Sequence, residues 1–264
     1  MKSVTFIGSG NVAWHLARAM HTAGYEIRCV WSRTMDSAEK LASLVNARPV
    51  TELADIEAGD DIYVLCLNDE ALPSIAAKLR FQESLVVHTS GTLSIDILQG
   101  MSGNAGVLYP LQTLTKGVSV DISAVPFFIE ASSGGSMQEM EELAASLSAR
   151  VYKADSRQRL QLHMAAVFAC NYSNFMYTMA ADLLSDSGFN FEVLSPLIAE
   201  TTHKAINTGS LAAQTGPARR CDLNVMRKHI GLLASKPEYA EIYRLIARMI
   251  INRYHPGILN DAEL

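Results

Sequence analysis

The sequence is poor in cysteine and in charge and has no long apolar run, and each shortage excludes a class of protein. Its four cysteines lie far apart and form no CxxC pair, which argues against a zinc site or a disulfide framework and favours a reducing, cytoplasmic compartment. No long basic run appears and the net charge is -5, so nucleic acid is not an expected partner. No stretch is apolar over a length that could cross a membrane, and the first apolar run is broken too soon by glycine for a signal peptide.

The sequence does contain enough apolar material for a sizeable core. Hydrophobic residues make up 49% of the 264 residues and charged residues 19%. This balance is typical of a folded globular chain rather than a disordered one. The length allows one large domain or two modest ones, and the order of the apolar segments favours two.

Over residues 1–155, short apolar runs alternate with segments of helical periodicity. The runs predict strands at Val4–Ile7, Glu26–Trp31, Arg48–Val50, Asp61–Leu67, Ser84–His88, Val107–Leu111, Pro126–Glu130 and Arg150–Lys153. Helices are expected at Asn11–Thr22, Ser37–Leu44, a segment ending at Leu79, and Met137–Leu147. This alternation predicts an α/β domain of the Rossmann type, with a parallel sheet covered by helices on both faces.

From residue 156 onward the pattern becomes wholly helical. Gln158–Leu184 is apolar around most of its circumference, as expected of a helix buried between domains or subunits. Further helices are predicted at Phe191–Asn207, Asp222–Leu233 and Pro237–Tyr254. We therefore expect an all-helical domain over residues 156–264, which binds substrate and forms a homodimer.

The first predicted strand is joined to the first predicted helix by Gly8-Ser9-Gly10-Asn11-Val12-Ala13. In such a joint Gly8 would allow the tight turn, Gly10 would let a pyrophosphate approach the backbone, and Ala13 would let helix and strand pack closely. The helix beginning near Asn11 would direct its unpaired N–H groups at the phosphates. We interpret the segment as part of a dinucleotide site, and the alternative is a glycine-rich turn that serves packing only.

The end of the second predicted strand indicates which dinucleotide binds. An NAD-binding fold commonly carries an acid there, which binds the ribose 2′-hydroxyl. This chain has Ser32, Arg33 and Thr34 instead, and a hydroxyl beside a guanidinium suits the 2′-phosphate of NADP. NADP is therefore the expected cofactor, and the alternative is that Arg33 is an ordinary solvated arginine.

Polar residues also follow the next predicted strands. Because ligands gather at the carboxyl ends of the strands in an open α/β sheet, Leu67 and Asn68 on one strand end and Ser90 and Gly91 on another are expected to border the ribose and nicotinamide. Tyr109-Pro-Leu-Gln112 ends a third strand at the same edge. The alternative for each polar side chain is simple turn chemistry.

A polar strip on the long predicted helix offers candidate catalytic residues. On a regular helix His163, Cys170, Asn171, Asn174 and Thr178 fall within about a third of the circumference. Histidine is a natural proton donor beside a hydride acceptor. We assign His163 and Asn171 as catalytic, about 80° apart around a regular helix; the alternative is a polar seam satisfied by neighbouring helices.

The segment Thr215-Gly-Pro-Ala-Arg-Arg-Cys-Asp222 is a further candidate. Its Arg219 and Arg220 precede a helix N-terminus, which suits an anion such as a carboxylate. The alternative is a helix-entry loop whose arginine pairs with Asp222 or with a domain interface.

Several of these segments together resemble a bacterial family with a Rossmann-like N-terminal domain and a helical C-terminal domain of the DUF2520 type. The matching segments are Gly8-Ser-Gly-Asn-Val-Ala13, His88-Thr-Ser-Gly91, Tyr109-Pro-Leu-Gln112, Ala166-Val-Phe-Ala-Cys-Asn-Tyr172 and Thr215-Gly-Pro-Ala-Arg-Arg-Cys-Asp222. The chain is more distantly similar to pyrroline-5-carboxylate reductase and the β-hydroxyacid dehydrogenases. The resemblance implies NADP, an oxidoreductase activity, a helical domain that forms dimers and an active site between the domains.

Departures from these relatives leave two functional hypotheses open. The β-hydroxyacid dehydrogenases commonly carry Lys-x-x-x-Asn on the long helix, and if Asn171 is that asparagine, Val167 stands where the lysine would be. Cys221 stands where the family more often has glycine. The first hypothesis is an NADP-dependent oxidoreductase that transfers hydride between nicotinamide and a small carbonyl, imine or hydroxy-acid substrate. The alternative, favoured by the missing lysine, is a non-catalytic NADP-binding redox sensor or assembly protein.

Overall fold

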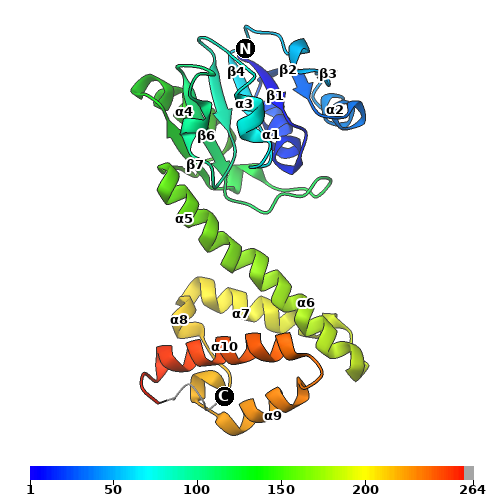
Figure 1. Ribbon diagram of the computed structural model, residues 1–264, viewed down its shortest axis with the longest axis vertical. Coiled ribbons are helices and arrows are strands. Elements are labelled where there is room, and N and C mark those ends of the chain that lie inside the picture. Colours follow the sequence, from blue (N-terminus) through cyan, green and yellow to red (C-terminus); the bar gives the residue numbers. More distant parts are fainter. Residues whose placement is uncertain (259–264) are drawn as a thin grey trace. The chain divides into compact units, whose positions relative to one another are not determined.

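The fold comes from a computed structural model that describes residues 1–258 (Figure 1). The chain divides into two compact units, one spanning Met1–Tyr172 and a second beginning at Ser173. The expected division of roles at residue 155, with cofactor binding before it and substrate binding after it, stays a prediction.

The first unit is built on an eight-stranded sheet in the order β3-β2-β1-β4-β5-β6-β7-β8. The strands are β1 Ser3–Ile7, β2 Glu26–Trp31, β3 Arg48–Val50, β4 Ile62–Leu65, β5 Leu85–His88, β6 Ala105–Pro110, β7 Phe127–Ala131 and β8 Val151–Lys153. Every predicted strand is present, with ends shifted by a few residues at most. The Rossmann-type sheet predicted from the alternation is therefore confirmed.

One strand departs from the predicted parallel sheet. Strand β7 pairs antiparallel with β6, whereas all the other neighbouring pairs are parallel. A parallel return to the same sheet usually needs a crossover helix. The connection from β6 to β7 contains only the short 3-10 turn Ile122–Ala124, so the chain comes back in the opposite direction.

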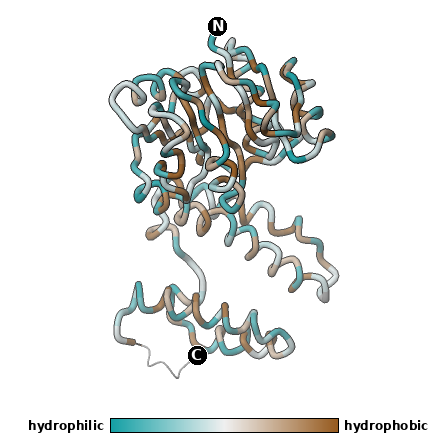
Figure 2. Tube along the Cα trace, turned by 45° about the horizontal axis from the view of Figure 1, so that its top comes forward, coloured by the Kyte–Doolittle hydropathy of each residue, from teal (hydrophilic) through white to brown (hydrophobic). Residues whose placement is uncertain are grey.

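Helices cover both faces of this sheet, and two apolar cores result. They are α1 Asn11–Thr22, α2 Met35–Ala42, α3 Leu72–Ala76 and α4 Gly134–Leu147. Successive strand residues point to opposite faces, so Phe6 packs in the core with α1, α2 and α4, while Ile7 packs in the core with α3. Figure 2 shows the hydrophobic residues gathered along the strands of this unit.

Helix α5, Ser156–Ala166, continues through a π-helical turn at Val167–Tyr172 into α6, Ser173–Leu184. The second unit adds α7 Ser195–Thr208, α8 Ser210–Ala213, α9 Leu223–Leu232 and α10 Pro237–Tyr254. The predicted helices are thus confirmed. Met164 and Phe168 are 57% and 64% exposed in the single chain, so the expected burial of Gln158–Leu184 between domains or subunits stays a prediction. Among residues 1–258, no helix has the length and apolar character needed to cross a bilayer.

A buried arginine holds α5 on the sheet. Asp155 and Gln158 form a capping box at the start of the helix, and the side chain of Arg159 is completely buried. Its guanidinium forms an ion pair with Glu130 of β7 and donates to the carbonyl oxygen of Ser90 at 3.1 Å. The first turns of α5 are thereby fixed against the loop that follows β5.

His88, at the end of β5, predicts an acid sensitivity of the fold. Its side chain is buried, and this burial, together with the positive charge of Arg159, lowers its pKa to about 3. Below about pH 6.5 the unfolded chain therefore binds a proton that the folded chain does not. We expect the free energy of unfolding to fall by about 2 kcal/mol between about pH 7 and about pH 5 from this residue, at about 1.4 kcal/mol per pH unit.

Chemical denaturation of the parent and of His88→Gln at both pH values measures this contribution. The variant should lose less stability on acidification than the parent. His203→Gln, at an exposed position, is the control and should keep the parent's pH dependence. An equal pH dependence in the parent and His88→Gln would contradict the assignment.

Candidate functional site

A cleft of about 750 Å³ lies beside the ends of β1, β2 and β4. Several of the residues predicted to bind a cofactor line it, namely Gly8, Ser9, Gly10, Ser32, Arg33, Leu67 and Asn68. These strands are parallel neighbours, so their carboxyl ends meet at one edge, where ligands of open α/β sheets gather. The volume falls within the range typical of small-molecule and cofactor sites.

The glycine turn is shaped for close approach to a ligand. Gly8 has a φ of +113°, its N–H donates to the carbonyl of Trp31 at 2.9 Å, and a Cβ there would lie 2.3 Å from the carbonyl oxygen of Cys66. At Gly10 a Cβ would meet nothing within 4 Å, and no side chain caps α1. The first N–H groups of α1 and the open backbone at Gly10 therefore fit the pyrophosphate of a dinucleotide.

The other residues of the turn connect it to its surroundings. Ala13 is buried in the core beneath α1, as expected for the small third residue, and Val12 packs partly against the same core. The hydroxyl of Ser9 donates to that of Ser32 at 2.9 Å. Asn11 accepts a hydrogen bond from the backbone N–H of Lys116 at 3.2 Å, so the turn is tied both to the end of β2 and to a distant loop.

Arg33 borders the cleft with an exposed side chain and forms no hydrogen bond or ion pair with the described residues 1–258. Thr34 begins α2 as its N-cap, makes no capping hydrogen bond through its side chain and does not line the cleft. Lys78 and Lys116 also line the cleft. Sequence reasoning missed both lysines, because neither stands next to a recognisable motif.

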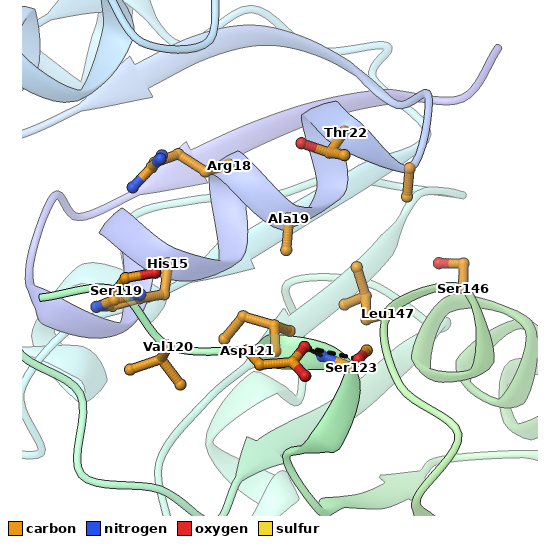
Figure 3. A pocket seen from close by; sticks show the side chains of 12 residues that line it. His15, Arg18, Ala19, Thr22, Ser119, Val120, Asp121, Ser123, Ser146 and Leu147 are labelled. Carbon is orange, nitrogen blue, oxygen red and sulfur yellow. Dashed lines mark hydrogen bonds between the residues drawn. The ribbon is translucent and has the colours of Figure 1, made fainter.

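The loop that carries Lys116 is held by α1. His15 contacts the carbonyl oxygen of Thr115 through Nε2 at 2.9 Å, one residue before the contact between Lys116 and Asn11. Further along this loop a hollow of about 400 Å³ opens beside α1 (Figure 3). It is lined by His15, Arg18 and Thr22 of α1, by Val120, Asp121 and Ser123 of the loop, and by Ser146 and Leu147 of α4. It contains none of the residues predicted from the sequence.

Ser90 organises the loop after β5 and does not line the cleft. Its hydroxyl donates to the carboxylate of Asp69 at 2.7 Å and accepts from the backbone N–H groups of Thr92 at 3.1 Å and Leu93 at 3.0 Å. Asn68 has a similar role at the end of β4, where its side chain accepts from the N–H of Ala71 at 3.0 Å. The turn chemistry considered for these polar side chains is therefore present.

Gly91 lies directly against two aromatic rings. A Cβ there would lie 2.9 Å from Nδ1 of His163 and 2.9 Å from the ring of Tyr109. The Tyr109 hydroxyl lies 3.2 Å from the same Nδ1, and the two rings meet edge to face with centroids 6.2 Å apart. Gly91, Tyr109 and His163 thus form one cluster along the edge where β5 and β6 end. Sequence reasoning singled out each residue but not their contact.

Asn171 lies in the π-helical turn with its side chain exposed. The angle of about 80° predicted between His163 and Asn171 assumed a regular α-helix, and Val167–Tyr172 interrupts that regularity. Cys170 and Asn174 are also exposed, and the Thr178 hydroxyl bonds the carbonyl of Asn174 at 3.4 Å. The predicted polar strip is therefore not a single regular face.

In the second unit, the loop with two arginines is a compact turn. The Arg219 guanidinium stacks over the ring of Tyr254 at 4.2 Å, and its carbonyl oxygen lies 2.8 Å from Nε2 of His255. Asp222 caps α9 by accepting from the N–H of Val225 at 3.2 Å, rather than pairing with an arginine. Cys221 has a φ of +55°, a left-handed conformation that glycine adopts more readily. The proposed role of this loop as an anion site stays a prediction.

Comparison with known proteins adds a family to this geometry. The profile described as NADP oxidoreductase coenzyme F420-dependent matches residues 3–91, and the domain of unknown function DUF2520 matches residues 125–250. No curated protein matches the chain in sequence. Solved structures, in contrast, match it over nearly its whole length.

A Thermotoga maritima protein is 16% identical, with a TM-score of 0.74 over 95% of this chain and 98% of its own. A reductive aminase from Aspergillus terreus, solved with NADPH4, cyclohexanone and allyl amine, is 17% identical, with a TM-score of 0.72 over 97% of this chain and 94% of its own. At these identities the two structures show a shared fold. A candidate NADP oxidoreductase from Bacteroides fragilis is 42% identical, with a TM-score of 0.88 over 96% of this chain and 98% of its own. The chain therefore belongs to the family of NADP oxidoreductases in which this Rossmann-type domain is followed by a DUF2520 domain.

Proposed function

We propose that the protein transfers hydride between NADPH and a small carbonyl, imine or hydroxy-acid substrate. The observation that carries the proposal is the cluster of Gly91, Tyr109 and His163. Strand β5 lies between β4 and β6 in the sheet. The cluster therefore lies at the edge formed by the carboxyl ends of the strands, which also borders the cleft beside Gly8 and Gly10. A proton-donating side chain near a dinucleotide site is what reduction of a carbonyl or imine requires.

The described residues suggest a division of labour. The turn Gly8–Ala13 would bind the pyrophosphate, and Ser32, Arg33 and Thr34 would bind the 2′-phosphate. Leu67, Asn68, Ser90 and Gly91 would border the ribose and nicotinamide. Ser90 would act by shaping the loop, because its hydroxyl bonds Asp69, its N–H donates to Nδ1 of His88 and its carbonyl accepts from Arg159. When bound, the cofactor supplies the hydride. His163 and Asn171 would donate hydrogen bonds to the oxygen or nitrogen of the substrate.

The substrate class is best approached through the relatives. The reductive aminase with the same fold was solved with cyclohexanone and allyl amine, so a ketone together with a primary amine is the first pair to test. The β-hydroxyacid dehydrogenases, to which the sequence is distantly similar, commonly carry Lys-x-x-x-Asn on the long helix, and if Asn171 is that asparagine, Val167 stands where the lysine would be. If the protein catalyses reduction, the proton must therefore come from another residue, and His163 is our candidate.

We also propose a cytoplasmic homodimer formed by the helical region. All four cysteines are free, which suits a reducing compartment. Large apolar side chains of the second unit are exposed in the single chain, including Ile206 at 76% and Leu232 at 81%. Apolar exposure of this kind is typical of a surface that another subunit covers.

The choice of cofactor can be tested with two substitutions in the cleft. Arg33→Ala should weaken the binding of NADPH by on the order of 1.5–3 kcal/mol, because it removes a charge-assisted hydrogen bond to the 2′-phosphate. The binding of NADH should be nearly unchanged. Lys116→Met should weaken the binding of both cofactors by a similar factor, since it removes a positive charge from the lining of the cleft that would hold the pyrophosphate and keeps the backbone N–H that bonds Asn11. Calorimetric titration of each variant with NADPH and NADH provides the measurement. Equal binding of NADPH and NADH by the parent would contradict the role of Arg33.

The catalytic role is tested with His163→Ala. If His163 donates the proton, turnover of NADPH with cyclohexanone and allyl amine, or with another productive pair from a carbonyl and imine panel, should fall by roughly 10²–10⁴-fold. The dissociation constant for NADPH should barely change. His229→Ala, on α9 in the second unit, is a matched control with parental turnover expected. A parent that binds NADPH but turns over no member of the panel would favour the non-catalytic sensor instead.

The dimer can be tested without any substrate. Sedimentation velocity at micromolar concentration should give the mass of two chains. Ile206→Glu and Leu232→Glu, which place charge on exposed apolar positions, should shift the equilibrium toward the monomer. Lys204→Glu, at an exposed position already charged, should leave it unchanged. A parental monomer at this concentration would refute the proposal.

A further inference from the structure

The contact between Tyr109 and His163 links two elements that are far apart in the sequence. Tyr109 lies near the end of β6 and is largely buried, while His163 lies on α5. The tyrosine hydroxyl is 3.2 Å from Nδ1 of the histidine. Because a neutral imidazole carries its proton on one nitrogen only, this contact bears on which nitrogen that is.

The direction of the hydrogen bond follows from the surroundings of the phenol. Among residues 1–258, Nδ1 of His163 is the sole hydrogen-bond partner of the Tyr109 hydroxyl. If Nδ1–H were the donor, the phenol proton of this largely buried tyrosine would have no acceptor among the described residues, which is costly. Burial also raises the pKa of Tyr109, so the phenol keeps its proton near neutral pH. The phenol O–H therefore donates, Nδ1 accepts, and the proton of the neutral ring lies on Nε2.

The two rings are held in place from both sides. A side chain at position 91 would collide with them, since its Cβ would be 2.9 Å from each. Arg159, one helical turn before His163, is fixed by Glu130 and by the carbonyl of Ser90, the residue next to Gly91. The orientation of the imidazole is thus set by packing as well as by the hydrogen bond.

We propose that Tyr109 is a positioning residue that holds His163 in the tautomer with its proton on Nε2, so that a substrate carbonyl oxygen or imine nitrogen meets a neutral N–H donor. A neutral imidazole placed in this way can polarise a substrate without first becoming charged. When its Nε2 proton passes to the substrate, the phenol proton of Tyr109 can pass to Nδ1, so the ring stays neutral and solvent reprotonates the tyrosine. Tyr109 would act only through His163 and would not contact the substrate. The functional part of the inference rests on the proposed role of His163, whereas the tautomer can be measured without any substrate.

The tautomer is tested by nitrogen NMR of protein labelled with ¹⁵N-histidine, recorded at about pH 8.5, two units above the reference pKa of histidine. The His163→Gln variant identifies the His163 signals. We expect the parent to show a protonated Nε2 and an unprotonated Nδ1. In Tyr109→Phe, which keeps the ring but removes the hydroxyl, the two nitrogen shifts should move toward each other as both tautomers become populated. Gly91→Ala should have the same effect, because it displaces the rings while the hydroxyl remains.

Tyr25→Phe is the matched control, because Tyr25 directly precedes β2, at the opposite end of the strands from this cluster, and its hydroxyl contacts Ser146 of α4 at 3.2 Å. It should leave the His163 shifts and turnover unchanged. Protonated Nδ1 in the parent, or unchanged His163 shifts in Tyr109→Phe, would overturn the tautomer assignment whatever the activity. Tyr109→Phe should also lower kcat by about tenfold with the dissociation constant for NADPH unchanged. A parental kcat despite altered shifts would overturn the positioning role. A failure of the proposed catalytic role of His163 would be seen separately, because His163→Ala would then keep the full turnover of the parent.

Discussion

The buried ion pair between Arg159 and Glu130 is the interaction on which the arrangement of the first unit's candidate site depends. A guanidinium removed from water is tolerated only when its donors are matched. Here they are matched by the Glu130 carboxylate, the Ser156 hydroxyl and the carbonyl oxygens of Ser90 and Leu93. One side chain thereby joins β7, the loop after β5 and the start of α5.

The antiparallel course of β7 is part of the same arrangement. In that register Glu130 pairs with Val107 of β6, and Val107 pairs on its other side with His88 of β5. The carboxylate therefore lies in the row of the sheet that ends at His88, next to the loop containing Ser90 and Gly91. The strand that departs from the expected direction is the one that supplies the partner for Arg159.

Local pattern was enough to predict much of the fold. The strand Glu26–Trp31 and the helices Asn11–Thr22 and Pro237–Tyr254 have the predicted bounds, because periodicity and caps are set by neighbouring residues. The glycine turn was recognisable for the same reason. The antiparallel direction of β7 was not recognisable, since it depends on the absence of a crossover helix from the connection between β6 and β7. The π-helical turn at Val167–Tyr172 has no signal in apolar spacing, and it altered the geometry inferred for Asn171. The position of Lys116 in the cleft and the contact between Tyr109 and His163 depend on tertiary contacts between distant segments. The spacing of residues close in sequence carries no information about such contacts.

The contacts between α1 and the loop after β6 bear on the thermodynamics of ligand binding. Two hydrogen bonds, from His15 to Thr115 and from Lys116 to Asn11, hold this loop against the first turns of the helix. The conformational entropy of the loop backbone is therefore lost when the chain folds and not when a dinucleotide arrives. A cleft wall that is already ordered leaves more of the interaction energy available as affinity, and the same stiffness limits how far the cleft can adapt to a ligand of another shape.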